Sequence, residues 1–572
     1  MRGFWPRLSV AEWITFALLA GTLSVTNIYT TLLTGWGDGG SIIAVIASAL
    51  ILGIISRKHI TVESLNLGQT MASAGGSVGF SVCAFAAVKM VDPTFAPDQP
   101  TMMVLFVAMG VLGALVGASV RKQMVKYFFP SGTACAVIQR TLTSEGETAK
   151  RPVRLLLIWG SLSALITIPT KIALKKGEGA ILHSIEILKE HGIGLAVEPL
   201  LYGIGIVVGP RIGLGMLLGA LAGSLVIIPT LKAYEFPPSV YGDWVKWMAI
   251  SVLTVPAFAT IAFAYLYRVQ PETPAGFSPG ATEYAPPASR PMIYGVLGFL
   301  SIAVTAYTCQ LLFGLSWLGS LLTIALSWPL CIMNGRVTGD TDINPVRLVA
   351  IVILTVFAWI VGGGVVAVLG MAIIGGTLAG MAVDMMQDYR TGFLVDANPH
   401  HQTTVQLIGT VVGALAAVPF ILYLDKSIGF GPGTSLVAPG AQIWSAMAKA
   451  FAGGAALGTP LITACIAVSV GFVLYAWLTV NPKSARYMPS LFGIGIGMLL
   501  PFEMSAAIFV GGLIRWITVL IYRGRDPQNA QAATVQAGED TMLVGSSVFA
   551  ASAVISVVVV LIAGLGWVHL AE

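Results

Sequence analysis

The chain has 572 residues, of which 56% are hydrophobic and only 10% are charged, and its net charge is +5 at pH 7. An average soluble domain carries about 25% charged residues, so this composition excludes an ordinary soluble globular protein. The small positive excess lies in loops between apolar runs, as in membrane proteins, and does not indicate a nucleic-acid partner.

Apolar runs recur along the whole chain, and many reach the roughly 20 residues that a helix needs to cross a bilayer. The runs do not alternate apolar and polar residues, so they are not barrel strands, and helices remain as the spanning elements. We therefore expect an all-α polytopic membrane protein with about 14–16 transmembrane helices. The predicted spans are 13–34, 41–56, 66–90, 101–120, 153–171, 212–231, 247–267, 291–313, 316–333, 348–386 (long enough for two), 404–424, 459–480, 503–522 and 543–568.

Positive charge precedes the first span, at Arg2 and Arg7, and no cleavable signal pattern is found. This start predicts an uncleaved first helix with its N-terminus in the cytoplasm. Further along, the stretch from Lys171 to His191 is polar and is interpreted as a short amphipathic surface helix.

A proline-rich polar linker, 268–290, divides the chain into an N-terminal transmembrane half, 1–267, and a C-terminal transmembrane half, 291–572. The halves share short similarities in the same order, which favours a duplicated fold. Whether the two repeats are parallel or inverted stays open. The similar pairs are PLLYGIGI (199–206) with PSLFGIGI (489–496), 56–69 with 334–347, and 129–139 with 398–406.

The 65 glycines lie largely inside apolar segments, where they allow close helix packing or buried unwound segments. Short apolar pieces at 193–210 and 488–501 predict broken or re-entrant half-helices. Four glycines of these pieces are expected to line the solute site: Gly203, Gly205, Gly493 and Gly495.

A dense polar island, NGRVTGDTDINPVR (334–347), separates two apolar runs. Asn344 is a good N-cap and Pro345 suits the first position of the following helix. Polar groups at the broken end of a membrane helix usually serve a permeating solute, and the alternative is a cytoplasmic loop with a well-capped helix. The charged residues gathered there are Arg336, Asp340, Asp342 and Arg347.

Asn66 aligns with Asn344 in the proposed repeat. If the halves are homologous, two helix N-termini face each other, and their positive dipole ends suit an anionic group such as a peptide carboxylate. Ordinary N-capping is the alternative. Gln69, three residues after Asn66, is assigned to the same solute site.

Carboxylates inside apolar segments are candidates for proton coupling, because a carboxylate held away from water can bind and release a proton near neutral pH. Glu503 follows a proline break and has almost no polar neighbours in sequence, so it is assigned to coupling together with Asp340 and Asp342. Glu198 and Asp384, the latter with Asp388 on the same helical face, are interpreted as interfacial carboxylates paired with lysine or arginine.

No metal site and no cofactor are expected. His400 and His401 would point about 100° apart on a helix and so seldom share one ion. The cysteines form no CxxC pair, and motifs such as HExxH and GxSxG are missing, so an enzyme is not expected.

Six segments carry polar and glycine-containing motifs: ESLNLGQTMASAGG (63–76), FFPSGTACA (128–136), NGRVTGDTDINP (334–345), MMQDYRTGFLVDANPHHQTTVQLIG (385–409), YMPSLFGIGIGMLLPFEMSAAIFVGGLI (487–514) and AGEDTMLVGSSVFA (537–550). Together they resemble the oligopeptide transporter (OPT) superfamily, which includes peptide transporters and yellow-stripe-like carriers of metal–nicotianamine complexes. The resemblance implies a secondary transporter, proton-coupled, with a solute path between two related halves.

Two departures from the family pattern leave the solute open. NPHHQ has histidines where members are commonly rich in arginine or lysine, and LPFEMS has a carboxylate where others often have small or hydroxylated residues. The short loops favour a prokaryotic-type member, and hence an integral protein of the bacterial inner (plasma) membrane.

The leading hypothesis is a symporter that uses protons to move oligopeptides or peptide-like small molecules by alternating access. A metal–chelate (siderophore- or nicotianamine-like) carrier is the alternative, and a passive channel is less favoured. The expected partners are the solute, protons and the lipid bilayer, with a homo-oligomer as an open alternative.

Overall fold

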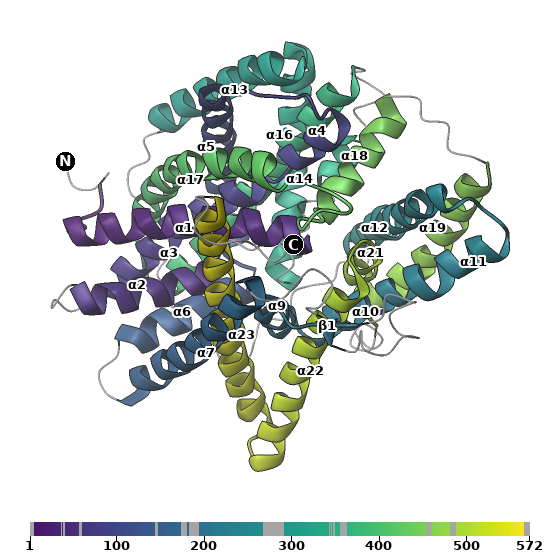
Figure 1. Cartoon of the computed structure of the whole chain (residues 1–572). Helices are drawn as coiled ribbons and strands as arrows, with labels where there is room; N and C mark the ends of the chain where they lie inside the picture. The colour runs from purple at the N-terminus through teal and green to yellow at the C-terminus, as the bar shows by residue number, and fades with distance from the viewer. Residues whose placement is uncertain are drawn as a thin grey trace. The chain divides into compact units, whose positions relative to one another are not determined.

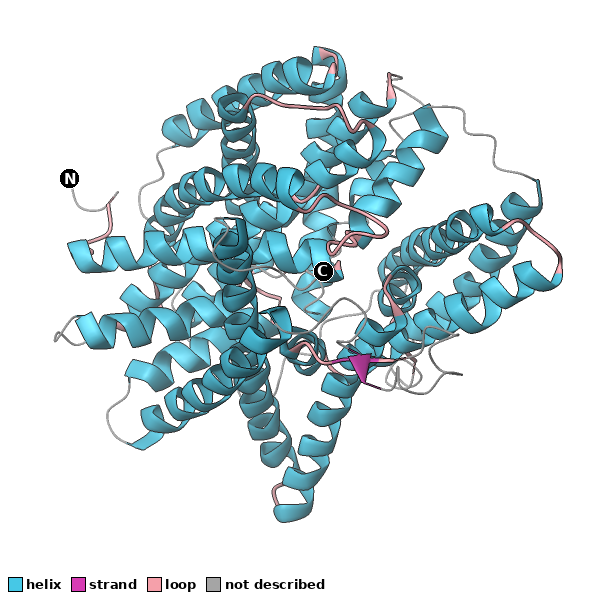
Figure 2. Cartoon of the chain, viewed as in Figure 1, coloured by secondary structure: helices cyan, strands magenta, loops and turns pink. Residues whose placement is uncertain are grey.

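The computed structural model describes residues 5–35, 37, 40–55, 60–127, 129–143, 147–172, 180–181, 194–266, 291–341, 344, 346, 349–354, 363–452, 459–480 and 488–564. Helices make up nearly all of this part of the chain (Figures 1 and 2). The strands found in it are β1, Ala180–Ile181, and β2, Leu195–Ala196, which pair antiparallel.

Ten helices within the described ranges are long and apolar enough to cross a membrane, which confirms the all-α polytopic prediction. The other predicted crossings coincide with helices that are shorter or less fully described, or run into segments outside the described residues. The predicted surface helix at Lys171–His191 also lies mostly outside them.

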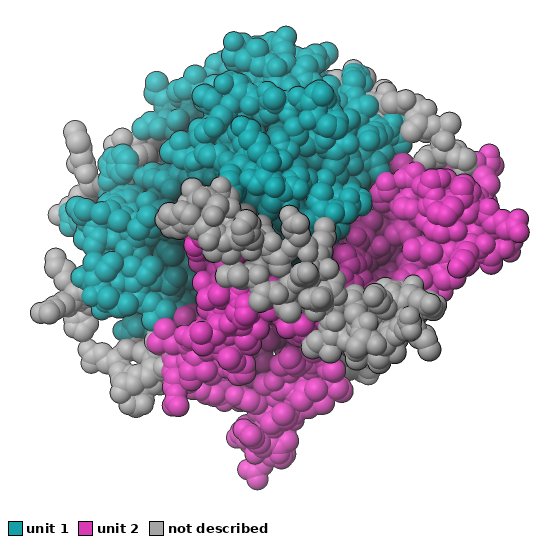
Figure 3. All heavy atoms as spheres, in the orientation of Figure 1, with its two compact units in different colours: residues 1–150, 270–455 teal, residues 151–269, 456–572 magenta. Residues whose placement is uncertain are grey.

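The chain forms two compact units, coloured separately in Figure 3. Unit 1 comprises Met1–Lys150 and Gln270–Ala455, and unit 2 comprises Arg151–Val269 and Ala456–Glu572. Each unit therefore takes residues from before and after the 268–290 linker. The division into two repeated halves stays a prediction.

Unit 1 is built from helices that begin and end at recognisable signals. Ser9 and Glu12 form a capping box at the start of the first helix, and Gly35, with φ of 72°, ends it. The helices are α1 Val10–Thr34, α2 Ser41–Ile55, α3 Val62–Val82, α4 Phe85–Val91, α5 Gln99–Met124, α6 Pro130–Thr143, α13 Pro291–Phe313, α14 Trp317–Thr341, α16 Val365–Leu394, α17 Pro399–Ser427 and α18 Pro439–Ala452.

Helix α3 lies in the core of unit 1, packed against α1, α16 and α17. Close approach depends on glycine: a Cβ at Gly75 would overlap the backbone of Ala20 in α1, and one at Gly409 would overlap the carbonyl oxygen of Met71. Phe16 and Val405 pack with Met71 in one of the apolar clusters around this helix. This packing holds the polar face of α3 in the interior of the unit.

Unit 2 contains α7 Glu147–Ile172 (which starts just inside unit 1), α9 Pro199–Val208, α10 Pro210–Leu221, the π-helix η1 Ala222–Ile227, α11 Ile228–Ala233, the 3-10 helix η2 Pro238–Val240, α12 Tyr241–Leu266, α19 Thr459–Val480, α21 Leu491–Leu499, α22 Phe502–Arg525 and α23 Ala530–Gly564. Short helices stand where the half-helices were predicted: α9 has 10 residues and α21 has 9. Each is followed by a break and a proline, at Gly209–Pro210 and at Leu500–Pro501.

Candidate functional site

The polar core of unit 1 lies among four helices, α3, α6, α16 and α17. Its centre is a pair of carboxylates on α16, Asp384 and Asp388, which are 6% and 0% exposed. Residues four apart on a helix lie on one face, so both side chains are on the same side of α16. They lie well inside this 30-residue helix, and the prediction that Asp384 is an interfacial carboxylate is wrong.

One hydroxyl is within reach of both carboxylates. The Ser73 Oγ of α3 lies 2.8 Å from Asp388 Oδ2 and 3.4 Å from Asp384 Oδ2. A serine hydroxyl carries a single proton and can donate to only one of them at a time, and the shorter distance favours Asp388. The two carboxylates are thus close enough to compete for one donor.

A chain of glutamines continues from Asp388. Gln69 Nε2 donates to Asp388 Oδ1 over 2.8 Å, and Gln139 Nε2 of α6 donates to Gln69 Oε1 over 2.5 Å. Gln69 Nε2 is also 3.4 Å from Thr391 Oγ1, whose hydroxyl donates to the carbonyl oxygen of Gly132. Three helices are therefore tied together through one carboxylate.

Helix α17 contributes two more glutamines with the same four-residue spacing. Gln406 Nε2 donates to Asp384 Oδ2 over 3.2 Å, and Gln402 Nε2 donates to the backbone carbonyl of Asp388 over 2.7 Å. Both side chains are fully buried. The donor of each amide is used by α16, which leaves its oxygen for another partner.

Several buried polar atoms of this core have no hydrogen-bond partner within the described chain. They are the amide oxygens of Gln139, Gln402 and Gln406, the hydroxyl of Thr70, and both amide atoms of Asn66. Buried polar groups in native proteins are nearly always paired, so such a cluster indicates water, an ion or a solute. Most of the unpaired atoms are acceptors, and no ion pair among the described residues reaches Asp388.

This arrangement suits a positively charged partner. Two carboxylates and several amide oxygens offer acceptors to a proton, a cation or an ammonium group. Within the described residues no group of three or more His, Cys, Asp or Glu is placed to hold a metal ion. The two histidines contact different partners, His400 Nδ1 lying 3.1 Å from Tyr294 OH and His401 Nδ1 lying 3.1 Å from Glu63 Oε1.

Gln69 is a predicted solute residue that lies in this core, and Asn66 is fully buried one turn away. The prediction that Asn66 stands at a helix N-terminus is wrong. Helix α3 begins at Val62, and Thr61 is its N-cap, accepting a hydrogen bond from the Ser64 N–H. Thr61 lies just before the apolar stretch and supplies the capping oxygen, so Asn66 falls inside the helix.

The polar island does not form a loop after Met333, as predicted, because α14 continues to Thr341. Asn334 is buried within it and donates from Nδ2 to Asn344 Oδ1 over 2.9 Å, while Arg336 is exposed. No proline interrupts 334–341, so the helix can extend through these polar residues. The Asp340 side chain, Asp342, Pro345 and Arg347 lie outside the described structure, and the predicted roles at Asn344 and around it stay predictions.

The remaining predicted site residues belong to unit 2. Glu503 is half-buried in the first turn of α22, and its role in coupling stays a prediction. The four glycines lie inside helices rather than at their breaks. A Cβ at Gly205 would overlap the carbonyl oxygen of Ile508, and one at Gly493 would fall 2.6 Å from that of Ile212. Close helix packing explains these two without a solute.

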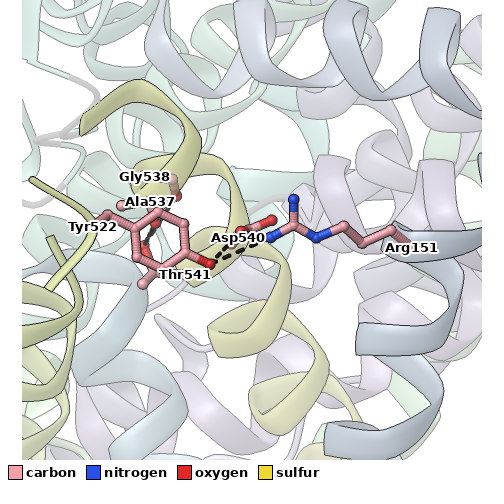
Figure 4. Close-up of polar contacts among 6 residues, drawn as sticks. All are labelled: Arg151, Tyr522, Ala537, Gly538, Asp540 and Thr541. Atoms are coloured by element: carbon pink, nitrogen blue, oxygen red, sulfur yellow. Dashed lines mark hydrogen bonds and ion pairs between the residues drawn. The ribbon is translucent and has the colours of Figure 1, made fainter. Parts of the chain in front are cut away.

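The C-terminal motif segment also holds a polar cluster of unit 2, drawn in Figure 4. Arg151 of α7 forms an ion pair with Asp540 of α23, with 2.6 Å between Nη2 and Oδ2. Tyr522 of α22 donates to the same carboxylate oxygen over 2.8 Å. Thr541 Oγ1 donates to the backbone of its own helix, at Ala537. The cluster joins three helices and is interpreted as a structural brace.

The carboxylate pair had a signal in the sequence that was given too little weight. Polar residues recur at a spacing of four in three separate apolar helices: Gln69 and Ser73, Asp384 and Asp388, and Gln402 and Gln406. That spacing places each pair on one helical face. Three such faces in one bundle predict a shared polar centre more specifically than any single carboxylate does.

Comparison with known proteins agrees with the helical membrane fold. A "Putative oligopeptide transporter" of Haemophilus influenzae is 21% identical over 86% of this chain and 85% of its own length. A "Probable metal-nicotianamine transporter YSL6" of Arabidopsis thaliana is 28% identical over 45% of this chain and 40% of its own length. The sequence model of the family described as OPT oligopeptide transporter protein matches residues 8–563. The chain therefore belongs to the OPT oligopeptide transporter family.

Proposed function

We propose that this OPT-family transporter is a proton-coupled secondary active carrier of oligopeptides or peptide-like small molecules, with Asp384 and Asp388 as its coupling site. The observation that carries the proposal is the burial of both carboxylates within reach of the single Ser73 hydroxyl. We place the protein in a bacterial inner membrane with a cytoplasmic N-terminus, on the charge pattern of its sequence.

The physical argument is that two like charges repel strongly where water is excluded. Taking up one proton removes this repulsion and lets the protonated carboxyl donate a hydrogen bond to its neighbour or to Gln69. Releasing it on the other side of the membrane restores the acceptor-rich state. A peptide also carries an ammonium group, which the same acceptors could receive, so that proton and solute would act on one cluster.

The peptide solute is favoured by the relative that matches most of this chain, which is named as an oligopeptide transporter. A metal–chelate solute is the second candidate, because several partial matches are plant proteins named as metal-nicotianamine transporters. The described residues supply no set of metal ligands of their own, so a metal would have to arrive with its ligands already bound.

The proposal is tested in proteoliposomes with a labelled di- to tetrapeptide pool, with and without an inward proton gradient. We expect gradient-driven accumulation in the wild type and its loss in Asp388→Asn, which keeps the shape and hydrogen-bonding of the side chain but cannot ionise. Asp526→Asn, at an exposed aspartate after α22, is the matched control and should accumulate peptide normally.

The other outcomes discriminate. If Asp388→Asn accumulates peptide like the wild type while Glu503→Gln does not, the coupling site lies in unit 2 at Glu503. If the wild type accumulates no peptide under any gradient, the peptide proposal fails, and metal–chelate complexes are the next solutes to load.

A further inference from the structure

Unit 1 contains a small cavity apart from the carboxylate cluster. Its walls come from α1, α3, α4, α16 and α18, and they include Phe80, Ser81, Ile373, Ala441 and Trp444. The cavity volume is about 30 Å³, about twice the 10–15 Å³ that one water requires. None of the described residues that line it is charged.

Two polar side chains of this wall have no hydrogen-bond partner within the described chain. They are the Trp444 indole N–H and the Thr377 hydroxyl, on residues that are 8% and 2% exposed. A buried tryptophan N–H is usually paired, since it is an obligatory donor. The neighbouring Ser81 hydroxyl, by contrast, donates to the carbonyl oxygen of Ser77 over 2.9 Å. The cavity therefore presents two unused polar groups between apolar walls.

The chemistry of the wall selects the group that it can bind. The indole N–H requires an acceptor, and the threonine hydroxyl can donate to the same acceptor or accept from an adjacent N–H. A carboxylate would satisfy the indole but would bury its charge without a positive partner, which is costly. A neutral amide carbonyl meets every condition, because it accepts a hydrogen bond and carries no net charge.

The cavity shares its helices with the carboxylate cluster. Thr377 and Asp384 are seven residues apart on α16, almost two turns, so they lie on nearly the same helical face about 10 Å apart along the axis. Ser73, Ser77 and Ser81 repeat every four residues along α3, which packs on this part of α16. One pair of helices therefore carries both a charged polar centre and an uncharged one.

We propose that the cavity at Trp444 and Thr377 is a subsite for a neutral amide carbonyl of the transported solute. The inference rests on the proposed transport of peptide-like solutes and narrows it: the solute contributes at least one uncharged peptide-type group to unit 1. A compound whose acceptors are all carboxylates would not use this subsite.

The test uses the full-length protein and N-acetylalanine amide, an uncharged probe with two amide carbonyls. The rise in melting temperature with probe concentration, measured for each protein relative to its own unliganded value, gives an apparent Kd. Losing one hydrogen bond to a neutral group weakens binding by roughly 3- to 10-fold. We expect that loss in Trp444→Phe, which removes the N–H and keeps a ring, and in Thr377→Val, which removes the hydroxyl.

Matched controls are Trp477→Phe on α19 and Thr518→Val on α22, both in unit 2, and they should keep the wild-type Kd. The inference is overturned if the probe does not stabilise the wild type, if the two cavity variants bind it like the wild type, or if acetate binds as tightly as the amide. The last result would mean that the cavity does not select a neutral group.

The same probe separates this inference from the proposed function. It carries no charge and needs no gradient, so Asp388→Asn should bind it like the wild type. If the wild type binds the probe through Trp444 but accumulates no peptide, the proposed coupling fails while the subsite stands. If peptide accumulates and Trp444→Phe alters neither its KM nor the probe's Kd, the coupling stands and the subsite fails.

Discussion

Gln69 of α3 donates a hydrogen bond to Asp388 of α16 over 2.8 Å, although 319 positions separate the two residues in the sequence. The same side chain accepts from Gln139 of α6. Gln69 is therefore the link between a buried carboxylate and a third helix, and its replacement affects both neighbours.

We expect Gln69→Leu to destabilise the protein by about 1–3 kcal/mol, because it leaves buried polar atoms of Asp388 and Gln139 without a partner at similar side-chain volume. Gradient-driven peptide uptake should fall with it. Chemical unfolding in detergent and uptake in proteoliposomes measure the two effects. Gln123→Leu, at an exposed position of α5, is the control, and equal stability of the two variants would contradict the proposed link.

Glycine at position 205 is expected to be required for packing. A methyl group there would overlap the carbonyl oxygen of Ile508, and the backbone of α22 cannot yield as a side chain could. Gly205→Ala should therefore cost about 1–3 kcal/mol in unfolding free energy. Gly471→Ala is the matched control: no atom lies within 4 Å of its added carbon. Alanine is the better helix former by up to about 1 kcal/mol, so this control should be neutral or stabilising. A neutral Gly205→Ala would refute the close contact.

The ion pair between Arg151 and Asp540 is expected to contribute modestly to stability. The arginine side chain is 50% exposed and the aspartate side chain 14%, so solvent screens much of the attraction. A double-mutant cycle with Arg151→Met and Asp540→Asn should give a coupling free energy of no more than about 1 kcal/mol. The coupling should decrease at high salt. A coupling of several kcal/mol, unaffected by salt, would instead indicate a buried functional pair.

Asp98 should make the stability of α5 depend on pH. It is the N-cap of that helix, and hydrogen bonds from the Thr101 hydroxyl and backbone N–H lower the pKa of its carboxyl below the ordinary value of 3.8. Since the folded pKa is below the unfolded one, the stabilisation is present above the unfolded value and is lost as pH falls through the folded value.

The measurement is thermal unfolding between pH 5 and pH 3. Asp98→Asn keeps a capping oxygen but does not titrate. The wild type should therefore lose more stability over this interval than the variant does. Parallel curves for the two proteins would show that the cap does not depend on the charge.

The sequence by itself determined that the chain is an all-α membrane protein of the OPT type. Long apolar runs leave helices as the available spanning structure, since backbone groups must be paired within hydrocarbon. Local signals also located the short helices α9 and α21, because glycine and proline end helices through their own backbone geometry. Motifs such as ESLNLGQ and NPHHQTTVQ identified the family because they are contiguous in the chain.

Only the tertiary structure decided which polar residues meet. Asp384 lies in an apolar segment whose sequence suits a lipid-facing or a buried helix equally well, and its environment depends on how α16 is rotated against α3 and α17. Its partners Ser73 and Gln406 lie on other helices, so no local pattern pairs them. Asn66 shows the same limit: its helix starts one turn earlier because Thr61 supplies the cap. Helix formation depends on local sequence, whereas the site depends on contacts between segments that are distant in the chain.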